Sequence, residues 1–324
     1  MGSLRGGWHM RGAGKARGVG CVTGWGRVCC AAVVLCTLVV LGCGGTDDAD
    51  GGTGDGAEAG GGATVVLADT SFMADIARNV AGDRLEVSSL LPIGADPHSF
   101  EPTPQDAKRV ADSQAVIINV SGFEPLVDDL ITGAGRPDLV VIEAAAGLAG
   151  GSNDLHFWLD PLKVIDYAEN IADGLSIVDP EGAETYRQNA AAYSQRLREL
   201  DAWIVTQVET IPPEGRLLVT NHESFGYFAE RYGFRVVGTV FPSAAGEGSP
   251  SAQQLVALVK EIQTAGAPAI FLETGSNTDL ALQVAREAGV EVITDLYTHS
   301  LGENASSYLD MMRWNVNLIV GALR

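Results

Sequence analysis

Residues 180–211, PEGAETYRQNAAAYSQRLRELDAWIVTQVETI, are the stretch that decides the fold. Apolar residues recur in it every three or four positions, at Tyr186, Ala190, Tyr193, Leu197, Leu200, Ile204 and Val208. This spacing predicts one helix of roughly 28 residues, or about 42 Å at about 1.5 Å per residue. The average globular helix has only about 11–12 residues. So long a helix predicts a rigid connection that limits how far its two flanking segments can move apart.

Short apolar runs alternate with helical patterns on both sides of this helix. The predicted strands are 64–68, 85–91, 115–120 and 139–144 before it, and 216–220, 234–240, 268–273 and 290–295 after it. The predicted helices between them are 71–82, 102–113, 123–135, 223–232, 251–265, 278–288 and 303–323. Strands that alternate with helices are typical of parallel sheets. The predicted fold is therefore α/β with two lobes, each a parallel sheet flanked by helices, joined by one long backbone helix; the parts are 64–179, 180–211 and 212–324.

The N-terminal segment, residues 1–42, has a different composition. It holds basic residues, no Asp or Glu, and the apolar run VCCAAVVLCTLVVLG over 28–42. This run of 15 residues is short for a membrane span, which needs about 20, and suits a secretion signal. It ends in VLGC, which resembles the lipobox where a lipoprotein signal is cut before an acylated cysteine. We expect a lipoprotein signal peptide over 1–42 and lipidation at Cys43. The alternative is an uncleaved membrane anchor, and Leu41 is an unusual residue in a lipobox. Met10 is a second candidate for the first residue of the translated chain.

The composition of the rest restricts its partners. Residues 43–63 are rich in glycine and acidic residues and cannot form a core, which predicts a flexible tether. No cysteine lies beyond Cys43, so the mature chain has no disulfide to stabilise it. The 324 residues include 21 Lys and Arg against 41 Asp and Glu, a formal net charge of −20. Such an acidic chain is predicted to have no nucleic-acid partner, because phosphates repel it.

Polar residues follow four of the predicted strands. His98 lies in IGADPHSFEPTPQD (93–106), His156 in SNDLHFWLDP (152–161) and His222 in VTNHESFGYF (219–228), and Asp295 ends the strand 290–295. Ligands of open α/β sheets bind beyond the carboxyl ends of the strands. Two of these residues belong to each lobe, so we expect the four to face one another. Three imidazoles and one carboxylate suit a divalent transition metal such as Zn²⁺.

Each of these residues also has an ordinary interpretation. A single loop histidine is more often a surface or hydrogen-bonded group than a ligand, and His299 in DLYTHSLGEN is left as such a histidine. Asp295 alone is compatible with a helix N-cap. A zinc hydrolase is a second class of function, with Glu223 as its only nearby base. However, Asp295 would close the position that a catalytic water needs, and the HExxH motif is absent.

Four motifs together resemble a known family. PHSFEPTPQD (97–106), DLHFWLDP (154–161), VTNHESFGYFAERYGF (219–234) and ITDLYTHSLG (293–302) are similar to the metal-ligand regions of the cluster-9 solute-binding proteins of ABC transporters. The resemblance covers about residues 64 to 323, in order. It implies two lobes joined by a long helix, with a metal held between them by His98, His156, His222 and Asp295, and no enzymatic activity.

The resemblance also implies a cargo, partners and a location. Zn²⁺ is expected because His222 stands where manganese-specific members commonly have glutamate; a manganese- or iron-specific member is the alternative. Many zinc-uptake members carry a histidine-rich loop between the first two ligands, but residues 121–155 contain no histidine. The expected partners are an ABC permease and its ATPase subunit. The protein is expected to be a monomer, lipid-anchored on the outer face of the cytoplasmic membrane, facing either a periplasm or the cell exterior.

Overall fold

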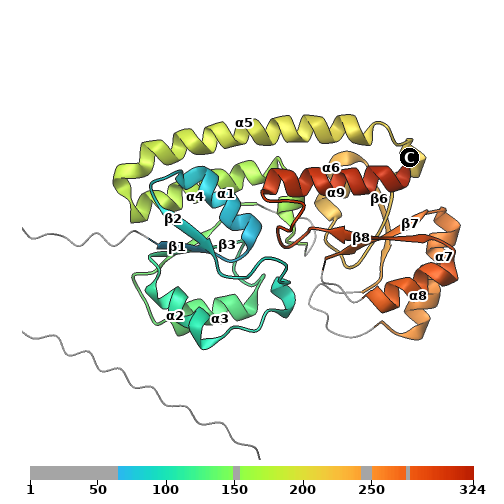
Figure 1. Ribbon diagram of the computed structural model, residues 1–324, viewed down its shortest axis with the longest axis horizontal. Helices are drawn as coiled ribbons and strands as arrows, with labels where there is room; N and C mark the ends of the chain where they lie inside the picture. Colours follow the sequence, from blue (N-terminus) through green and yellow to red (C-terminus); the bar gives the residue numbers. More distant parts are fainter. Residues whose placement is uncertain (1–64, 149–153, 242–249, 275–277) are drawn as a thin grey trace, which may run out of the picture. The chain divides into compact units, whose positions relative to one another are not determined.

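The computed structural model describes residues 65–148, 154–241, 250–274 and 278–324 (Figure 1). In it, the amphipathic stretch at the centre of the chain forms helix α5, Ala183–Val208. A single 3₁₀ turn, η3 (Pro180–Gly182), precedes it. All the apolar positions that predicted the helix are buried. The helix packs on α1 (Ser71–Ala81) and α4 (Lys163–Val178) at one end and on α9 (Tyr308–Leu323) at the other. One continuous element therefore joins the two lobes, as predicted.

The N-terminal lobe is a parallel sheet of four strands in the order β2-β1-β3-β4. These strands are β1 (Val65–Ala68), β2 (Glu86–Ser89), β3 (Ala115–Ile118) and β4 (Val140–Glu143). Successive side chains of a strand point to opposite faces of a sheet. Val66 and Ala115 therefore join the core beneath α1 and α4, whereas Leu67 and Val116 pack on the helices α2 (Pro104–Asp112) and α3 (Pro125–Gly133).

The C-terminal lobe repeats this plan with the order β6-β5-β7-β8, again all parallel. Its strands are β5 (Leu217–Thr220), β6 (Arg235–Thr239), β7 (Ala269–Glu273) and β8 (Glu291–Leu296). Helices α7 (Ala252–Ala265) and α8 (Thr278–Ala288) cover one face, where Leu258 and Val284 meet Val219 and Ile270. Helix α6 (Gly226–Tyr232) belongs, with α5 and α9, to the large core on the other side. The two-lobed α/β fold is confirmed.

One helix was not predicted. The chain forms α4 over Lys163–Val178, and its buried face includes Val164, Tyr167 and Ile171. This face packs on α5 and on β4. At Gly174 a Cβ atom would lie 2.5 Å from Cγ1 of Ile142, so only glycine lets α4 approach the sheet this closely.

Buried and partly buried hydrogen bonds cross from one lobe to the other. The Tyr308 hydroxyl at the start of α9 donates to the carbonyl oxygen of Trp158 at 2.6 Å, and the Tyr308 N–H donates to Asp75 Oδ2 of α1 at 2.9 Å. The Tyr227 hydroxyl donates to the carbonyl oxygen of Asp154 at 2.9 Å. These contacts hold together the strand ends from which the candidate ligands project.

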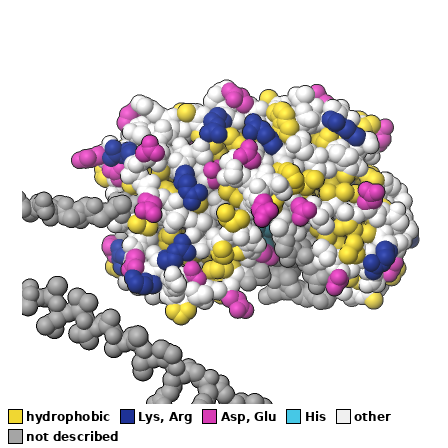
Figure 2. Space-filling model, in the orientation of Figure 1, with side chains coloured by type: hydrophobic (Ala, Val, Ile, Leu, Met, Phe, Trp, Pro, Cys, Tyr) yellow, Lys and Arg dark blue, Asp and Glu magenta, His cyan; other side chains and the backbone are white. Residues whose placement is uncertain are grey.

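The predicted signal peptide, Cys43 and the tether over 43–63 lie outside the described residues. Within the described part of the chain, no helix combines the length and the apolar character needed to cross a membrane. The face drawn in Figure 2 carries acidic and basic side chains scattered over both lobes, and very little histidine surface is visible on it.

Candidate metal centre

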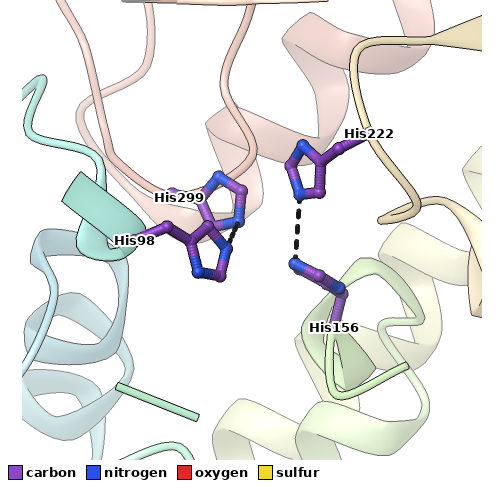
Figure 3. A group of neighbouring side chains, drawn as sticks. All are labelled: His98, His156, His222 and His299. Carbon is purple, nitrogen blue, oxygen red and sulfur yellow. Dashed lines mark hydrogen bonds between the residues drawn. The ribbon is translucent and has the colours of Figure 1, made fainter. Parts of the chain in front are cut away.

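Four histidines meet where the carboxyl ends of the strands of both lobes converge (Figure 3). His98 lies in the 3₁₀ turn η1 (Pro97–Ser99), which follows β2, and His156 directly precedes the turn η2 (Phe157–Leu159), which follows β4. His222 follows β5, and His299 follows β8. The structure therefore brings together the three predicted histidines, two from the first lobe and one from the second. The fourth member is His299.

The Nε2 atoms of these rings point at one another. The Nε2 atoms of His98 and His299 are 3.3 Å apart, and those of His222 and His156 are also 3.3 Å apart. One ring nitrogen from each of the four lies within 4.8 Å of the other three. A tetrahedral zinc site with Zn–N distances of about 2.0–2.1 Å has nitrogen pairs about 3.3 Å apart. The cluster is therefore close to the dimensions of a tetrahedral site with four nitrogen ligands.

The cluster is secluded from solvent. The exposed fractions of His156, His222 and His299 are 3%, 3% and 6%, and His98 is half-buried. The ring of Phe123 lies edge-on to both His98 and His156, with centroids 5.2 Å and 5.5 Å away. An ion bound at this point would be shielded from water by aromatic rings. Its entry or release would require some separation of the surrounding loops.

Two carboxylates contact the outer nitrogens of three of the rings. Asp154 Oδ1 lies 2.7 Å from Nδ1 of His156. Glu273, the last residue of β7, places Oε1 at 3.0 Å from Nδ1 of His222 and Oε2 at 3.2 Å from Nδ1 of His299. A carboxylate that accepts from Nδ1–H leaves Nε2 free to bind a metal, and such pairs are common behind metal-bound histidines. Sequence reasoning missed Glu273, whose only signal was its place at the end of a buried strand.

The surroundings change the protonation of the histidines. Burial lowers the pKa of His98 to about 2, assisted by the neighbouring histidines, and burial also lowers the pKa of His156 to about 4. Burial opposes protonation of His222 too, but the Glu273 carboxylate outweighs it and the pKa of His222 is raised. Burial would raise the pKa of Glu273, but hydrogen bonds from His222 and His299 outweigh it and hold that pKa well below its ordinary value. His98 and His156 are therefore neutral and ready to ligate at neutral pH.

We expect zinc affinity to fall as the pH is lowered from about 7.5 to about 5, because metal must displace protons from its ligands. His98 and His156 stay neutral through this range, since their pKa values are about 2 and about 4, and they release no proton. The raised pKa of His222 makes it a site of competition. Four ordinary imidazoles would give a slope of log affinity against pH of about four. Because two of the four ligands release no proton, the slope should not exceed about two. Competition titrations with a chromophoric chelator across this range measure it, and a slope of about three or more would contradict the expected protonation states.

Asp295 lies outside the cluster, so the structure does not bring the whole expected ligand set together. Strand β8 continues to Leu296, which is buried, whereas Asp295 and the preceding Thr294 are both exposed. Its Oδ2 accepts a hydrogen bond from Thr294 Oγ1 at 3.0 Å, and its backbone adopts a φ of 71°. His299, a few residues later in the same motif, stands where the aspartate was expected. The signal that could have identified it was its position in a strand-end loop, the same as for the other three histidines.

The loop that carries His299 is tied to the N-terminal lobe. Trp158 Nε1 donates to the carbonyl oxygen of Thr298 at 2.7 Å. Ser300 Oγ lies 3.0 Å from Ser71 Oγ and accepts from the Gly94 N–H at 2.7 Å. His299 therefore belongs to the second lobe by sequence, and the residues on either side of it are hydrogen-bonded to the first lobe.

Two parallel sheets, one long connecting helix and histidines that converge from both lobes define a class of two-lobed binding protein with its site at the junction of the lobes. The chain belongs to the family described as zinc-uptake complex component A, periplasmic, whose model matches residues 66–322. The predicted resemblance is thus confirmed.

Individual relatives agree with this assignment. The manganese-binding lipoprotein MntA of Halalkalibacterium halodurans is 35% identical over 292 residues, which cover 88% of this chain and 94% of the relative. The Mn-bound periplasmic metal binding protein of Candidatus Liberibacter asiaticus superimposes with a TM-score of 0.71 and 28% identity, over 81% of this chain and 100% of that one. The periplasmic zinc binding protein TroA of Treponema pallidum shares the fold, with a TM-score of 0.74, 23% identity and coverage of 81% and 99%. These relatives are binding proteins, and the chain is likewise not an enzyme.

Proposed function

We propose that this chain is the solute-binding component of an ABC transporter, and that it captures Zn²⁺ between its lobes with His98, His156, His222 and His299. The observation that carries the proposal is the convergence of four buried or half-buried imidazoles, with Nε2 pairs 3.3 Å apart. The carboxylates behind three of the rings support it, because they orient ligands in the manner usual for metal sites.

The donor set favours zinc. Imidazole nitrogen suits Zn²⁺, whereas carboxylate and carbonyl oxygen suit Mn²⁺. All four clustered residues offer nitrogen, and the nearby carboxylates contact the far side of the rings. Manganese is the second candidate cargo, because MntA, which is 35% identical, is named as a manganese-binding protein. A fourth histidine also argues against a hydrolase, since it occupies the position that a catalytic water would need.

The predicted anchor gives this capture a place in the cell. Lipidation of Cys43 after removal of residues 1–42 would hold the body on the outer face of the cytoplasmic membrane, and residues 43–63 would act as its tether. There the monomer would dock on a membrane permease. Its lobes, 64–179 and 212–324, would be closed on the ion and joined by the helix 180–211. ATP hydrolysis by a separate subunit would drive release and transport.

Elemental analysis of protein purified without added metal tests the proposal directly. We expect about one zinc per chain, and we expect zinc to displace manganese in a competitive titration, because a nitrogen donor set suits Zn²⁺ better than Mn²⁺. The absence of bound metal after incubation with zinc would refute metal capture. Tighter binding of manganese than of zinc would retain capture and transfer the cargo to the second candidate.

Replacing His222 with Glu should shift the preference toward manganese. The substitution exchanges a nitrogen donor for a carboxylate, which we expect to reduce the ratio of zinc to manganese affinity by at least about tenfold. His222→Gln is the matched control, because it has a similar size and no charge. Parallel competition titrations of the two variants measure the ratio. If His222→Glu binds metal with an unchanged ratio of zinc to manganese affinity, the ligand at position 222 does not set selectivity.

A further inference from the structure

Glu273 is placed between two candidate ligands that come from different loops. Its side chain is buried, with an exposed fraction of 7%. Oε1 lies 3.0 Å from Nδ1 of His222, and Oε2 lies 3.2 Å from Nδ1 of His299. The rings of His222 and His299 are stacked, with centroids 5.2 Å apart and an interplanar angle of 21°. One carboxylate thus spans the outer edges of two nearly parallel imidazoles.

The chemistry of a carboxylate restricts both rings in the same way. An ionised carboxylate only accepts hydrogen bonds, and a neutral imidazole carries one N–H and one lone pair. Each ring that is bonded to Glu273 must therefore carry its proton on Nδ1. The lone pair is then on Nε2, the atom that faces the other histidines: Nε2 of His299 is 3.3 Å from that of His98, and Nε2 of His222 is 3.3 Å from that of His156.

The same carboxylate also supplies charge that the ligands lack. Four neutral imidazoles bring no negative charge to a divalent cation. Glu273 behind His222 and His299, together with Asp154 behind His156, places two carboxylates directly outside the ring nitrogens. Carboxylates in this position raise the basicity of ligating imidazoles.

We propose that Glu273 is a positioning residue that sets the tautomers of His222 and His299 together and so prepares the second-lobe half of the site before metal arrives. The proposal rests on the proposed function, metal binding by the four histidines, but it makes a separate statement about the metal-free protein. Both rings must carry Nδ1–H in the absence of any ion.

The variant Glu273→Gln distinguishes control of the two tautomers from simple packing, because glutamine has nearly the same shape as glutamate. An amide has one accepting oxygen and one donating nitrogen, so it cannot accept from both rings. Ser224 Oγ donates to Oε1, on the His222 side, at 3.3 Å, which favours the amide oxygen there. The amide nitrogen then faces His299, whose Nδ1 must accept, and its proton moves to Nε2. Thr298 Oγ1, 3.0 Å from the same nitrogen, is a hydroxyl that can donate or accept and so does not prevent the change.

Long-range ¹H–¹⁵N correlation spectra of the metal-free full chain identify histidine tautomers directly. They are recorded at the alkaline end of a pH titration, where the ring signals no longer change and the rings are neutral, because the pKa of His222 is raised above the ordinary value of about 6.5. The chain has five histidines, so the signals can be assigned by single His→Asn substitutions. We expect Nδ1–H on His222 and His299 in the wild type and Nε2–H on His299 in Glu273→Gln. Zinc affinity of the variant should fall by about 10–100-fold, as is typical for loss of a carboxylate behind a ligand. Asp295→Asn, the same change at an exposed carboxylate, should alter neither measurement.

Several outcomes would overturn the proposal. Nε2–H on either ring of the metal-free wild type would do so without any variant, which covers the case that Glu273→Gln does not fold. Unchanged tautomers in Glu273→Gln would also do so, whether zinc affinity falls or stays the same, because the carboxylate would then act by charge or packing alone. Failure of the wild type to bind zinc would refute the proposed function instead. The tautomers measured in the metal-free protein would still test the role of Glu273.

Discussion

Replacing His299 with Ala should raise the dissociation constant for zinc by more than about 100-fold, because loss of a mere hydrogen-bond partner of a ligand already costs about 10–100-fold. His299 presents Nε2 at 3.3 Å from Nε2 of His98 and is only 6% exposed. Its removal would leave three imidazoles and a gap that water must fill.

The matched control is Asp295→Ala, which removes an exposed carboxylate from the same strand-end region. Because Asp295 lies outside the histidine cluster, its loss should change the zinc dissociation constant by less than about twofold, as is usual for surface substitutions. Competition against a chromophoric chelator measures both variants under one set of conditions. A large loss in Asp295→Ala together with a small loss in His299→Ala would reverse the assignment of the fourth ligand.

Zinc should also stabilise the folded chain strongly, and a chelator should remove this stabilisation. An ion that binds only the folded state adds about 4 kcal/mol to the free energy of unfolding when its concentration is about 1,000 times the dissociation constant. For a body of this size, that corresponds to a rise of about 8–16 °C in the melting temperature. The ligands come from both lobes, so the ion would link the two sheets as well as the loops that carry them.

Thermal unfolding followed by circular dichroism, with zinc and then with excess chelator, tests this expectation. His156→Asn is the informative variant, because the His156 ring is 3% exposed and belongs to the cluster. Zinc should therefore raise the melting temperature of this variant much less than that of the wild type. Asp295→Ala should keep the full effect. An equal rise in melting temperature for the wild type and His156→Asn would show that zinc stabilises the chain from another site.

Much of the fold could be predicted because its elements have clear periodicity. The buried positions of α5 recur at helical spacing. The central strands β1, β3, β5 and β7 are mostly apolar runs, as expected for strands covered on both faces. Helix α4 was missed although Val164, Tyr167 and Ile171 have the same spacing. Its first turn follows the DLHFWLDP motif, which was interpreted only as a ligand region.

The candidate site was less predictable, because it depends on where strands end and on contacts between lobes. His98, His156 and His222 could be found from their positions after strands. The choice between Asp295 and His299 depended on how the chain leaves β8. The strand ends at Leu296, one residue beyond the predicted strand, and Asp295 is exposed. Glu273 could not be predicted at all, since its contacts require two loops, distant in sequence, to meet at the end of β7.

The most direct test of metal capture by the four histidines is a crystal structure of the zinc-loaded protein with anomalous diffraction measured at the zinc edge. We predict one strong peak about 2.0–2.1 Å from Nε2 of each of His98, His156, His222 and His299. A peak held by Asp295, or one that leaves any two of these histidines beyond bonding distance, would contradict the proposed site.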